Sequence, residues 1–213
     1  MKKRILSVVV ILGLLGAVTP ASAVELLGVE LEFDARFGLG LNSCVSDGDA
    51  KCDDIGSSVS LLLAPGVRFL DYFGLYLDIN IGWLSPDDKT GVDSLSTVQI
   101  MPVFRGIYII DGPFPIEVFG GLGAGYSRMA TALKGGGDGT WSSFLNPKLN
   151  AGATYRLTDK IGVGLNIDFI FNNNILGAES CFNEGPIDQC EDLDSDDDQS
   201  EIMQILILGS YLF

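Results

Sequence analysis

The sequence contains no histidine among its 213 residues. This absence excludes Ser-His-Asp and Cys-His nucleophiles, histidine zinc sites, and the usual general base near neutral pH. Basic residues are also few, since 13 lysines and arginines stand against 28 aspartates and glutamates, for a formal net charge of −15. A chain this acidic does not attract nucleic acid through its overall charge. We therefore expect no catalytic residues, no cofactor and no nucleic-acid partner.

Long apolar runs are missing after the first two dozen residues. Lys2, Lys3 and Arg4 precede an apolar run over residues 5–18, and a small-residue motif ends at Ala23. A basic start, an apolar centre and small residues at the end predict a secretory signal peptide over residues 1–23. An uncleaved membrane anchor is the alternative, but this run is shorter than the roughly 20 residues that a spanning helix needs. We expect residues 24–213 to form one exported domain.

The sequence has only four cysteines, in two closely spaced pairs. Cys44 and Cys52 are eight residues apart, and Cys181 and Cys190 are nine apart. An exported chain meets an oxidising compartment, where disulfides form, and these spacings are too wide for a CxxC redox or zinc motif. Of the three possible connectivities, we expect the local one, with one disulfide within each of two loops.

What the sequence does contain is a repeated alternation of apolar and polar residues. Side chains on a strand point to opposite faces with period two, so this pattern predicts half-buried strands. Eight segments show it, at residues 29–41, 58–69, 73–83, 97–108, 116–126, 147–157, 161–171 and 199–213. Each segment is near or above the ~10 residues that a tilted strand needs to cross a membrane.

The connections between these segments alternate in length. Long polar loops follow the first, third, fifth and seventh segments, and the last of them runs from residue 172 to about residue 200. Only a few residues follow the second, fourth and sixth segments. Outer membrane barrels have long loops outside and short turns in the periplasm. The pattern therefore predicts an all-β fold, an eight-stranded antiparallel up-and-down transmembrane β-barrel.

Alternation does not show which face of the strands contacts water, because a soluble lipocalin-like barrel also alternates but holds its apolar side chains inside. The charged residues distinguish the two arrangements, because the polar strand faces carry six acids and five bases, whose charges nearly balance. These residues are Glu30, Glu32, Asp34, Asp78, Glu117, Asp168, Arg36, Arg68, Arg105, Lys148 and Arg156. A lipid-facing arginine near the bilayer midplane costs about 2 to 4 kcal/mol, and the apolar faces carry no charge. We expect the polar faces to line a narrow lumen.

Several of these charges are predicted to meet at the periplasmic end of that lumen. We expect an ionic network that combines three arginines with three glutamates, namely Arg68, Arg105, Arg156, Glu30, Glu32 and Glu117. An eight-stranded barrel is just filled by its side chains, so such a network acts as a plug. Carboxylate pairs can also perform acid-base chemistry, but beside several arginines we interpret these glutamates as structural ions.

The final strand carries a resemblance to a known family. It ends with Tyr211 and Phe213 on its apolar face, and a glycine-rich strand occupies residues 120–125. These features resemble small Gram-negative outer membrane barrels of the OmpA-like, OmpX-like and OmpW-like kinds. The resemblance implies export through the periplasm, an assembly signal at Tyr211 and Phe213 that the barrel assembly machinery reads, and contact with outer membrane lipid and lipopolysaccharide. It implies no enzymatic activity, because the family's enzymes rely on a histidine.

The last long loop is strongly acidic. Asp192, Asp194 and Asp196 match the first three ligand positions of an EF-hand loop, but Asp197 stands where glycine belongs and Met203 where the final glutamate belongs. These three aspartates form a candidate Ca²⁺ site. The alternative, which we favour, is a solvated acidic loop that gathers divalent cations loosely and holds no specific metal.

Two functions are compatible with this pattern. The first is a structural or surface-interaction role, performed by the disulfide-stapled acidic loops on the cell surface. The alternative is an OmpW-like small channel for small or hydrophobic solutes. The two differ in the state of the lumen, which is plugged in the first and open in the second.

Overall fold

The computed structural model describes residues 24–26, 29–44, 58–84, 92–113, 115–133, 138–172, 178–183, 188–193 and 200–213. The predicted signal peptide, Cys52, Asp194 and Asp196 lie outside these ranges. The described elements are all strands: β1 (Val24–Leu26), β2 (Val29–Cys44), β3 (Ser58–Phe69), β4 (Phe73–Leu84), β5 (Val92–Ile110), β6 (Ile116–Leu133), β7 (Asp138–Arg156), β8 (Ile161–Asn172), β9 (Ala178–Asn183), β10 (Asp188–Leu193) and β11 (Ser200–Leu212).

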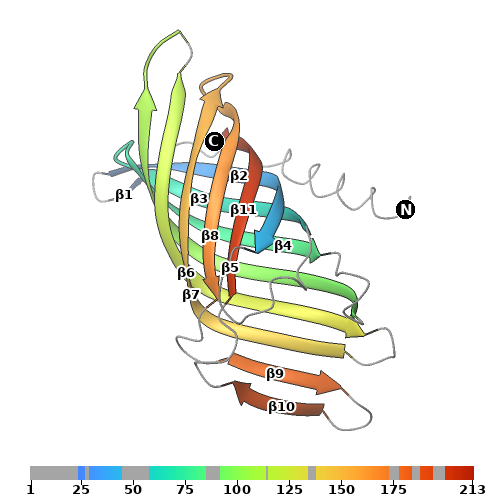
Figure 1. The fold of residues 1–213 in the computed structure, drawn as a ribbon. Helices are drawn as coiled ribbons and strands as arrows, with labels where there is room; N and C mark the ends of the chain where they lie inside the picture. The colour runs from blue at the N-terminus through green and yellow to red at the C-terminus, as the bar shows by residue number, and fades with distance from the viewer. Residues whose placement is uncertain are drawn as a thin grey trace.

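Eight of these strands form a closed antiparallel barrel (Figure 1). Strands β2 to β8 pair in sequence order, and β11 closes the ring between β8 and β2. The closing pair is long, running from Ile202 opposite Cys44 to Leu212 opposite Asp34. Closure provides hydrogen-bond partners for the backbone N–H and C=O groups of the terminal strand, and it removes the exposed edge of the sheet. This confirms the predicted eight-stranded barrel.

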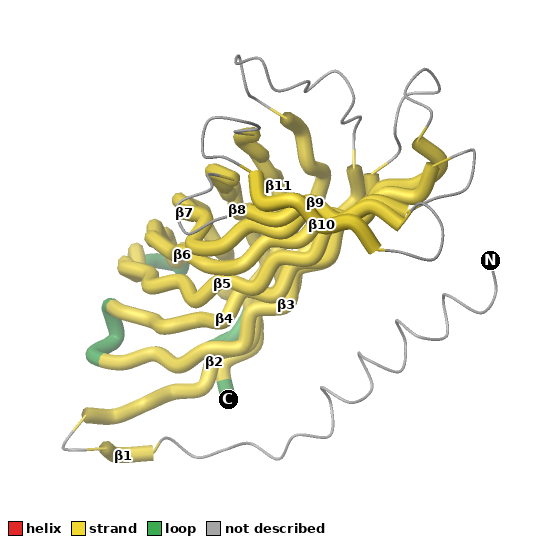
Figure 2. Tube along the Cα trace, turned by 90° about the horizontal axis from the view of Figure 1, so that it is seen from below, coloured by secondary structure: helices red, strands yellow, loops and turns green. Residues whose placement is uncertain are grey.

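The two ends of the barrel differ. Short connections at residues 70–72, 111–115 and 157–160 lie at one end, here called the short-turn end. Leu70 and Asp71 make the first of these turns with positive φ angles of 55° and 58°. Strand β1 and the C-terminal end of β11 lie at this same end (Figure 2). By the loop-length rule we expect the short-turn end to face the periplasm.

Beyond the opposite end, the sheet continues past the barrel. Strands β5, β6 and β7 have 19, 18 and 19 residues, and the outer part of β7 pairs with β9, which pairs in turn with β10 (Figure 1). The prediction that residues 172–200 form one irregular loop is therefore wrong for residues 178–183 and 188–193. These two short strands form a hairpin that extends the sheet, because their backbones find partners on β7.

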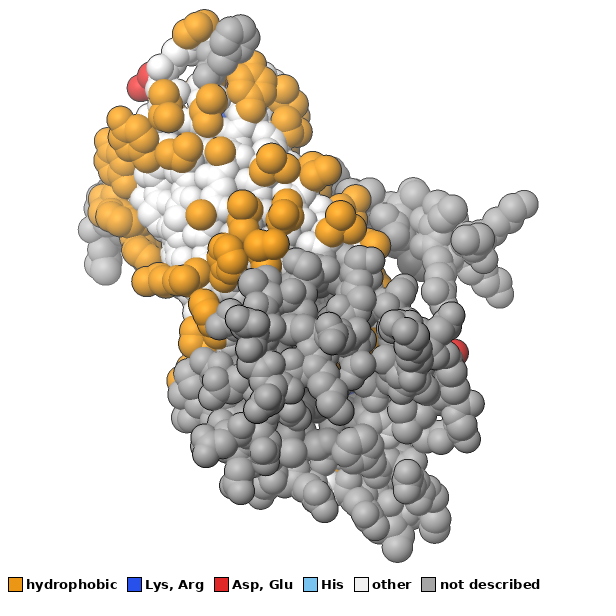
Figure 3. Space-filling model, in the orientation of Figure 1, with side chains coloured by type: hydrophobic (Ala, Val, Ile, Leu, Met, Phe, Trp, Pro, Cys, Tyr) orange, Lys and Arg blue, Asp and Glu red, His pale blue; other side chains and the backbone are white. Residues whose placement is uncertain are grey.

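Burial alternates along the strands as the barrel requires. Leu39, Leu122 and Ile207 are more than 60% exposed on the outer face, whereas the inward Arg36, Asp78 and Gln204 are at most 1% exposed. On the face shown in Figure 3, hydrophobic side chains are distributed over the described surface, and almost no charged side chains lie between them. A soluble barrel would have the opposite arrangement, so the apolar face is the membrane-facing one.

Glycines on the inner face make room for large luminal side chains. A Cβ on Gly40 would lie 2.8 Å from Cδ2 of Leu206, and one on Gly66 would lie within 2.5 Å of the Tyr76 ring. Leu206 and Tyr76 are at most 2% exposed, so each fills the space that a glycine leaves open. At these two positions the interior is therefore filled by side chains.

A β-bulge separates the barrel part of β7 from its extension. Phe144 and Leu145 together stand opposite the single residue Tyr126 of β6, and Leu145 has a φ of 55°. The extra residue reverses the inward and outward alternation, because Asn146 is buried below the bulge and Ser143 is buried above it. The Asn146 amide donates a 2.6 Å hydrogen bond to the Ser143 hydroxyl. Period-two alternation cannot continue through this point.

We predict that filling an inner glycine destabilises the barrel whereas filling an outer one does not. Gly66→Val forces a side chain into the Tyr76 ring, and overpacking of this kind costs about 1 to 3 kcal/mol in the free energy of unfolding. Gly106→Val is the matched control, because a Cβ there meets nothing closer than 3.8 Å. The free energy of unfolding of both variants is measured by urea unfolding in lipid vesicles, with heat-modifiable gel mobility as the readout. Equal stability of the two variants would contradict the packed lumen.

Candidate functional site in the barrel lumen

Charged side chains from four strands meet in the lumen near the short-turn end. This short-turn cluster consists of two acids and three arginines: Asp34, Glu117, Arg36, Arg68 and Arg156. Alternation turns all five inward, and their strands bring them to a similar level. Arg156 is the most accessible, with a side chain 22% exposed, while the other four are at most 6% exposed.

Each carboxylate in this cluster binds more than one arginine. Glu117 accepts hydrogen bonds from Arg36 at 2.7 Å, Arg68 at 2.6 Å and Arg156 at 3.1 Å. Asp34 accepts bonds from Arg36 at 3.2 Å and Arg68 at 3.0 Å. Buried charges persist only when they are paired and hydrogen-bonded, and here the two acids share the three arginines. The cluster therefore cross-links β2, β3, β6 and β7 through the lumen.

A second group of charges lies further from the short turns. This central cluster consists of Asp78, Arg105, Lys148 and Asp168, each at most 2% exposed. Both oxygens of Asp78 lie 2.9 Å from Nη2 of Arg105, and Nζ of Lys148 lies 2.7 Å from Asp78 and from Asp168. Two acids and two bases make the cluster electrically neutral.

Aromatic rings occupy the space between the two clusters. The guanidinium of Arg36 lies 4.9 Å from the Tyr76 ring centre and 4.5 Å from that of Phe119. Arg105 approaches the same two rings, at 4.3 and 5.7 Å. Cation-π attraction is strongest away from water, so these contacts stabilise both arginines. The Tyr76 hydroxyl also donates a 2.6 Å hydrogen bond to Asp34, which ties the ring to the short-turn cluster.

Uncharged polar side chains line the lumen beside and beyond the central cluster. Gln204 donates to the Ser60 hydroxyl at 2.6 Å and accepts from the Asn80 amide at 2.5 Å. Asn166 donates to Asp168 at 2.6 Å and accepts from Asn150 at 2.9 Å. The Gln204 bonds reach from β11 past β2 to β3 and β4, whereas the Asn166 bonds stay within β8 and the neighbouring β7.

The structure brings together some of the residues predicted for the ionic network. Arg68, Arg156 and Glu117 share one cluster, whereas Arg105 pairs with Asp78 in the other and does not join them. The side chains of Glu30 and Glu32 are outside the described part of the structure. Their backbones belong to β2, where Glu30 pairs with β1 and Glu32 pairs with β3.

Five further members of the two clusters were not part of the network predicted from the sequence. Asp34 and Arg36 complete the short-turn cluster. In the central cluster, Lys148 bridges Asp78 and Asp168. Their position on the polar strand faces was the available signal, but alternation does not show which charges lie at the same level of the barrel.

The remaining predicted site residues that the structure describes lie outside the two ionic clusters. Cys181 and Cys190 form a disulfide that joins opposite positions of β9 and β10, with Cα atoms 4.0 Å apart. The pairing of Cys44 with Cys52 lies outside the described residues. At the C-terminus, the rings of Tyr211 and Phe213 pack edge to face at 4.7 Å. The proposed Ca²⁺ ligands are not described as a set, since Asp194 and Asp196 are outside the described ranges.

Within the described ranges, no group of three or more acidic or cysteine side chains is arranged to hold a metal ion. The same ranges contain no helix that is long and apolar enough to cross a membrane.

Comparison with known proteins supports the same architecture. A family model described as an outer membrane protein beta-barrel domain matches residues 9–183. No curated protein matches the chain.

Several solved structures share the fold at low sequence identity. The structure of Neisserial surface protein A is 13% identical, with a TM-score of 0.52, over 86% of this chain and 97% of that one. The outer membrane protein OprG from Pseudomonas aeruginosa is 12% identical, with a TM-score of 0.55, over 85% and 95%. Ail, the attachment invasion locus protein of Yersinia pestis, is 13% identical, with a TM-score of 0.50, over 85% and 98%. At these identities the likeness concerns the fold.

We predict that Glu117→Ala strongly destabilises the barrel. The substitution removes the carboxylate shared by Arg36, Arg68 and Arg156. The buried Arg36 and Arg68 then share Asp34 alone, and Arg156 loses its ion pair. Breaking a buried ion pair by removing one partner costs about 3 to 5 kcal/mol in the free energy of unfolding. Asp159→Asn, in an exposed turn, is the control and should change stability by less than about 0.5 kcal/mol. Urea unfolding in lipid vesicles compares them, and equal losses would argue against the cluster.

Proposed function

The chain belongs to the outer membrane protein β-barrel family, and from this membership we propose that it is a plugged surface protein of the Gram-negative outer membrane. In this proposal the barrel anchors the chain, and the sheet extension with its β9–β10 hairpin provides a binding surface outside the cell. The observation that carries the proposal is the filled lumen, in which two ionic clusters and an amide network span the barrel.

The plug is supported by the way the luminal side chains connect the wall. Arg36 on β2 reaches Glu117 on β6, and Lys148 on β7 reaches Asp78 on β4. These contacts cross the lumen and are not confined to neighbouring strands. An ion entering from either end would have to displace paired charges that have no other partner in a low-dielectric interior. Such a lumen resists passage.

The surface role is supported by the part of the sheet that lies beyond the barrel. The β9–β10 hairpin is fixed by six residue pairs with β7 and by the disulfide between Cys181 and Cys190. A hairpin that is paired along one edge and braced by a disulfide loses little conformational entropy when a partner binds. Its sequence and the following residues are acidic, which favours a partner with a basic surface.

Passage of small or hydrophobic solutes is the second candidate function. The observation that favours it is a set of buried luminal atoms without a hydrogen-bond partner among the described residues, including Nη1 of Arg36, Nε and Nη1 of Arg105, and Oδ1 of Asn146. Water molecules would satisfy these atoms, so the lumen would be hydrated between the clusters. A catalytic role is not proposed, because a sequence without histidine lacks the usual catalytic base.

We predict that the purified chain gives no stable conductance steps in a planar lipid bilayer. The paired charges of the two clusters should block ion flow under an applied voltage. A known open porin, recorded in the same bilayers, controls for insertion. Reproducible steps from the intact chain would overturn the plug and favour the solute channel.

We also predict that removing residues 178–193 abolishes binding at the cell surface while the barrel still assembles. Cells that make the intact chain are tested for adhesion to immobilised extracellular proteins, against cells that carry an empty vector. Shortening residues 134–137, between β6 and β7, is the matched control and should preserve adhesion. Adhesion that survives loss of the hairpin would contradict its role, and heat-modifiable gel mobility verifies assembly of each variant.

A further inference from the structure

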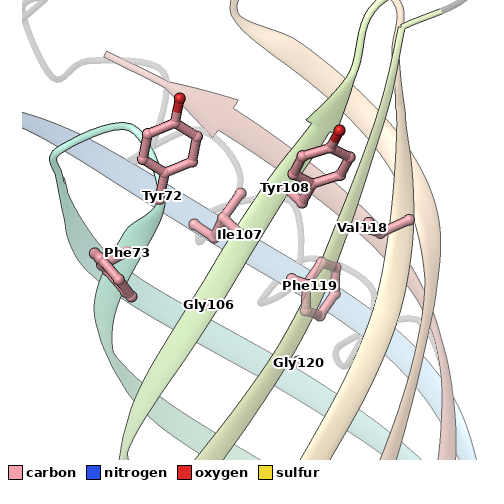
Figure 4. Close-up of a pocket in the computed structure, with 8 residues that line it drawn as sticks. All are labelled: Tyr72, Phe73, Gly106, Ile107, Tyr108, Val118, Phe119 and Gly120. Atoms are coloured by element: carbon pink, nitrogen blue, oxygen red, sulfur yellow. The ribbon is translucent and has the colours of Figure 1, made fainter.

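The outer wall of the barrel contains an apolar groove near the short-turn end (Figure 4). Its volume is about 410 Å³, and its lining comes from the β3–β4 turn and from β4, β5 and β6: Tyr72, Phe73, Tyr108, Val118 and two glycines, Gly106 and Gly120, with Ile107 and Phe119 behind them. This volume lies within the range of about 300 to 1,000 Å³ that is usual for small-molecule sites. The groove is separate from both ionic clusters.

Two glycines create this groove. Gly106 and Gly120 stand directly opposite each other on β5 and β6, and strand alternation turns both outward. A Cβ at either position would meet no atom closer than 3.8 Å. The inner glycines Gly40 and Gly66 differ, because a Cβ there would collide with a luminal side chain. Packing within the chain therefore does not require glycine at 106 or 120, and the missing side chains leave a gap in the wall.

Aromatic side chains border this gap. Phe73 stacks on Phe104 at 5.6 Å between ring centres, which forms a flat apolar wall on the side away from the short turns. Tyr72 and Tyr108 are 58% and 62% exposed, and Figure 4 shows both hydroxyls pointing to the same side. Tyrosines are enriched where a membrane protein crosses the interface, with the ring in hydrocarbon and the hydroxyl near the headgroups.

The surroundings of the groove decide what occupies it. The outer face of an outer membrane barrel is in contact with acyl chains, and the side chains beside the groove, such as Phe104 and Leu122, are exposed and apolar. The groove is continuous with this lipid-facing surface. It opens next to two tyrosine hydroxyls, which can donate hydrogen bonds to ester or phosphate oxygens.

From this geometry we propose that the groove is a binding site for one phospholipid of the leaflet at the short-turn end. One acyl chain lies over Gly106 and Gly120, against the rings of Phe73 and Tyr108. The headgroup lies at the level of the Tyr72 and Tyr108 hydroxyls. The lipid fills a gap in the wall that the chain itself leaves, so it should exchange more slowly than the lipids around it.

The test uses the intact chain in phosphatidylethanolamine vesicles that contain a small fraction of a photoactivatable phosphatidylethanolamine with a diazirine in its acyl chain. After illumination, mass spectrometry maps the labelled peptides. We expect the label to concentrate in residues 102–122. Residues 161–171, on another lipid-facing strand, should carry less label. Gly106→Leu with Gly120→Leu should reduce labelling of residues 102–122 about tenfold, since filling the gap excludes about two methylene groups of the lipid.

A matched control places a leucine elsewhere on the same outer face. Ala35→Leu, on the outer face of β2, which does not adjoin β5 or β6, should leave the labelling of residues 102–122 unchanged. Heat-modifiable gel mobility verifies that each variant folds. If the double variant does not assemble, the labelling experiment uses Gly106→Leu alone. Native mass spectrometry provides a second measurement, in which the wild type retains one phosphatidylethanolamine and the glycine variant loses it.

Three outcomes would overturn the proposal. Uniform labelling of the wall would show ordinary lipid contact without a site. Labelling of residues 102–122 that persists in the glycine variants would place the lipid elsewhere. Cross-linking of residues 102–122 to a second copy of the chain would show that the groove is a contact between barrels.

Discussion

Every charge on a membrane-spanning strand of this barrel must find its counter-ion inside the lumen. Hydrocarbon cannot solvate an arginine or an aspartate, so alternation turns these side chains inward. An eight-stranded lumen is too narrow to hold each of them in bulk water. Asp34, Glu117, Asp78 and Asp168 consequently bind arginines and a lysine directly. The two ionic clusters follow from this constraint, and they determine which strands are cross-linked through the interior.

The narrow lumen also limits the size of the neutral side chains that can lie next to one another inside it. Two large side chains cannot share one level of the lumen unless their neighbours are small. Tyr76 therefore lies against Gly66 and Gly74, and Phe119 lies against Gly152. The rings then separate the short-turn cluster from the central cluster and contact an arginine from each. These inner glycines thus have a packing function that Gly106 and Gly120 on the outer face do not have.

The sequence predicts the barrel better than it predicts the luminal partners. Period-two alternation reports which face a residue occupies, and this is enough for the eight strands and the lipid-facing surface. Which charges meet depends on the stagger between strands, which alternation does not report. Arg105 therefore pairs with Asp78 and not with Glu117. The bulge at Leu145 reverses the alternation of β7, and β9 and β10 lie in an acidic stretch that lacks the apolar pattern of a membrane strand.

The neutralised lumen also determines where the excess charge of the chain lies. The inward residues nearly balance, so most of the net charge of −15 belongs to the long connections and the sheet extension. A lumen whose charges are paired interacts weakly with dissolved ions, whereas the acidic extension has a net negative charge that acts on the surrounding medium. The surface chemistry can therefore change at the extension without disturbing the ion pairs of the barrel.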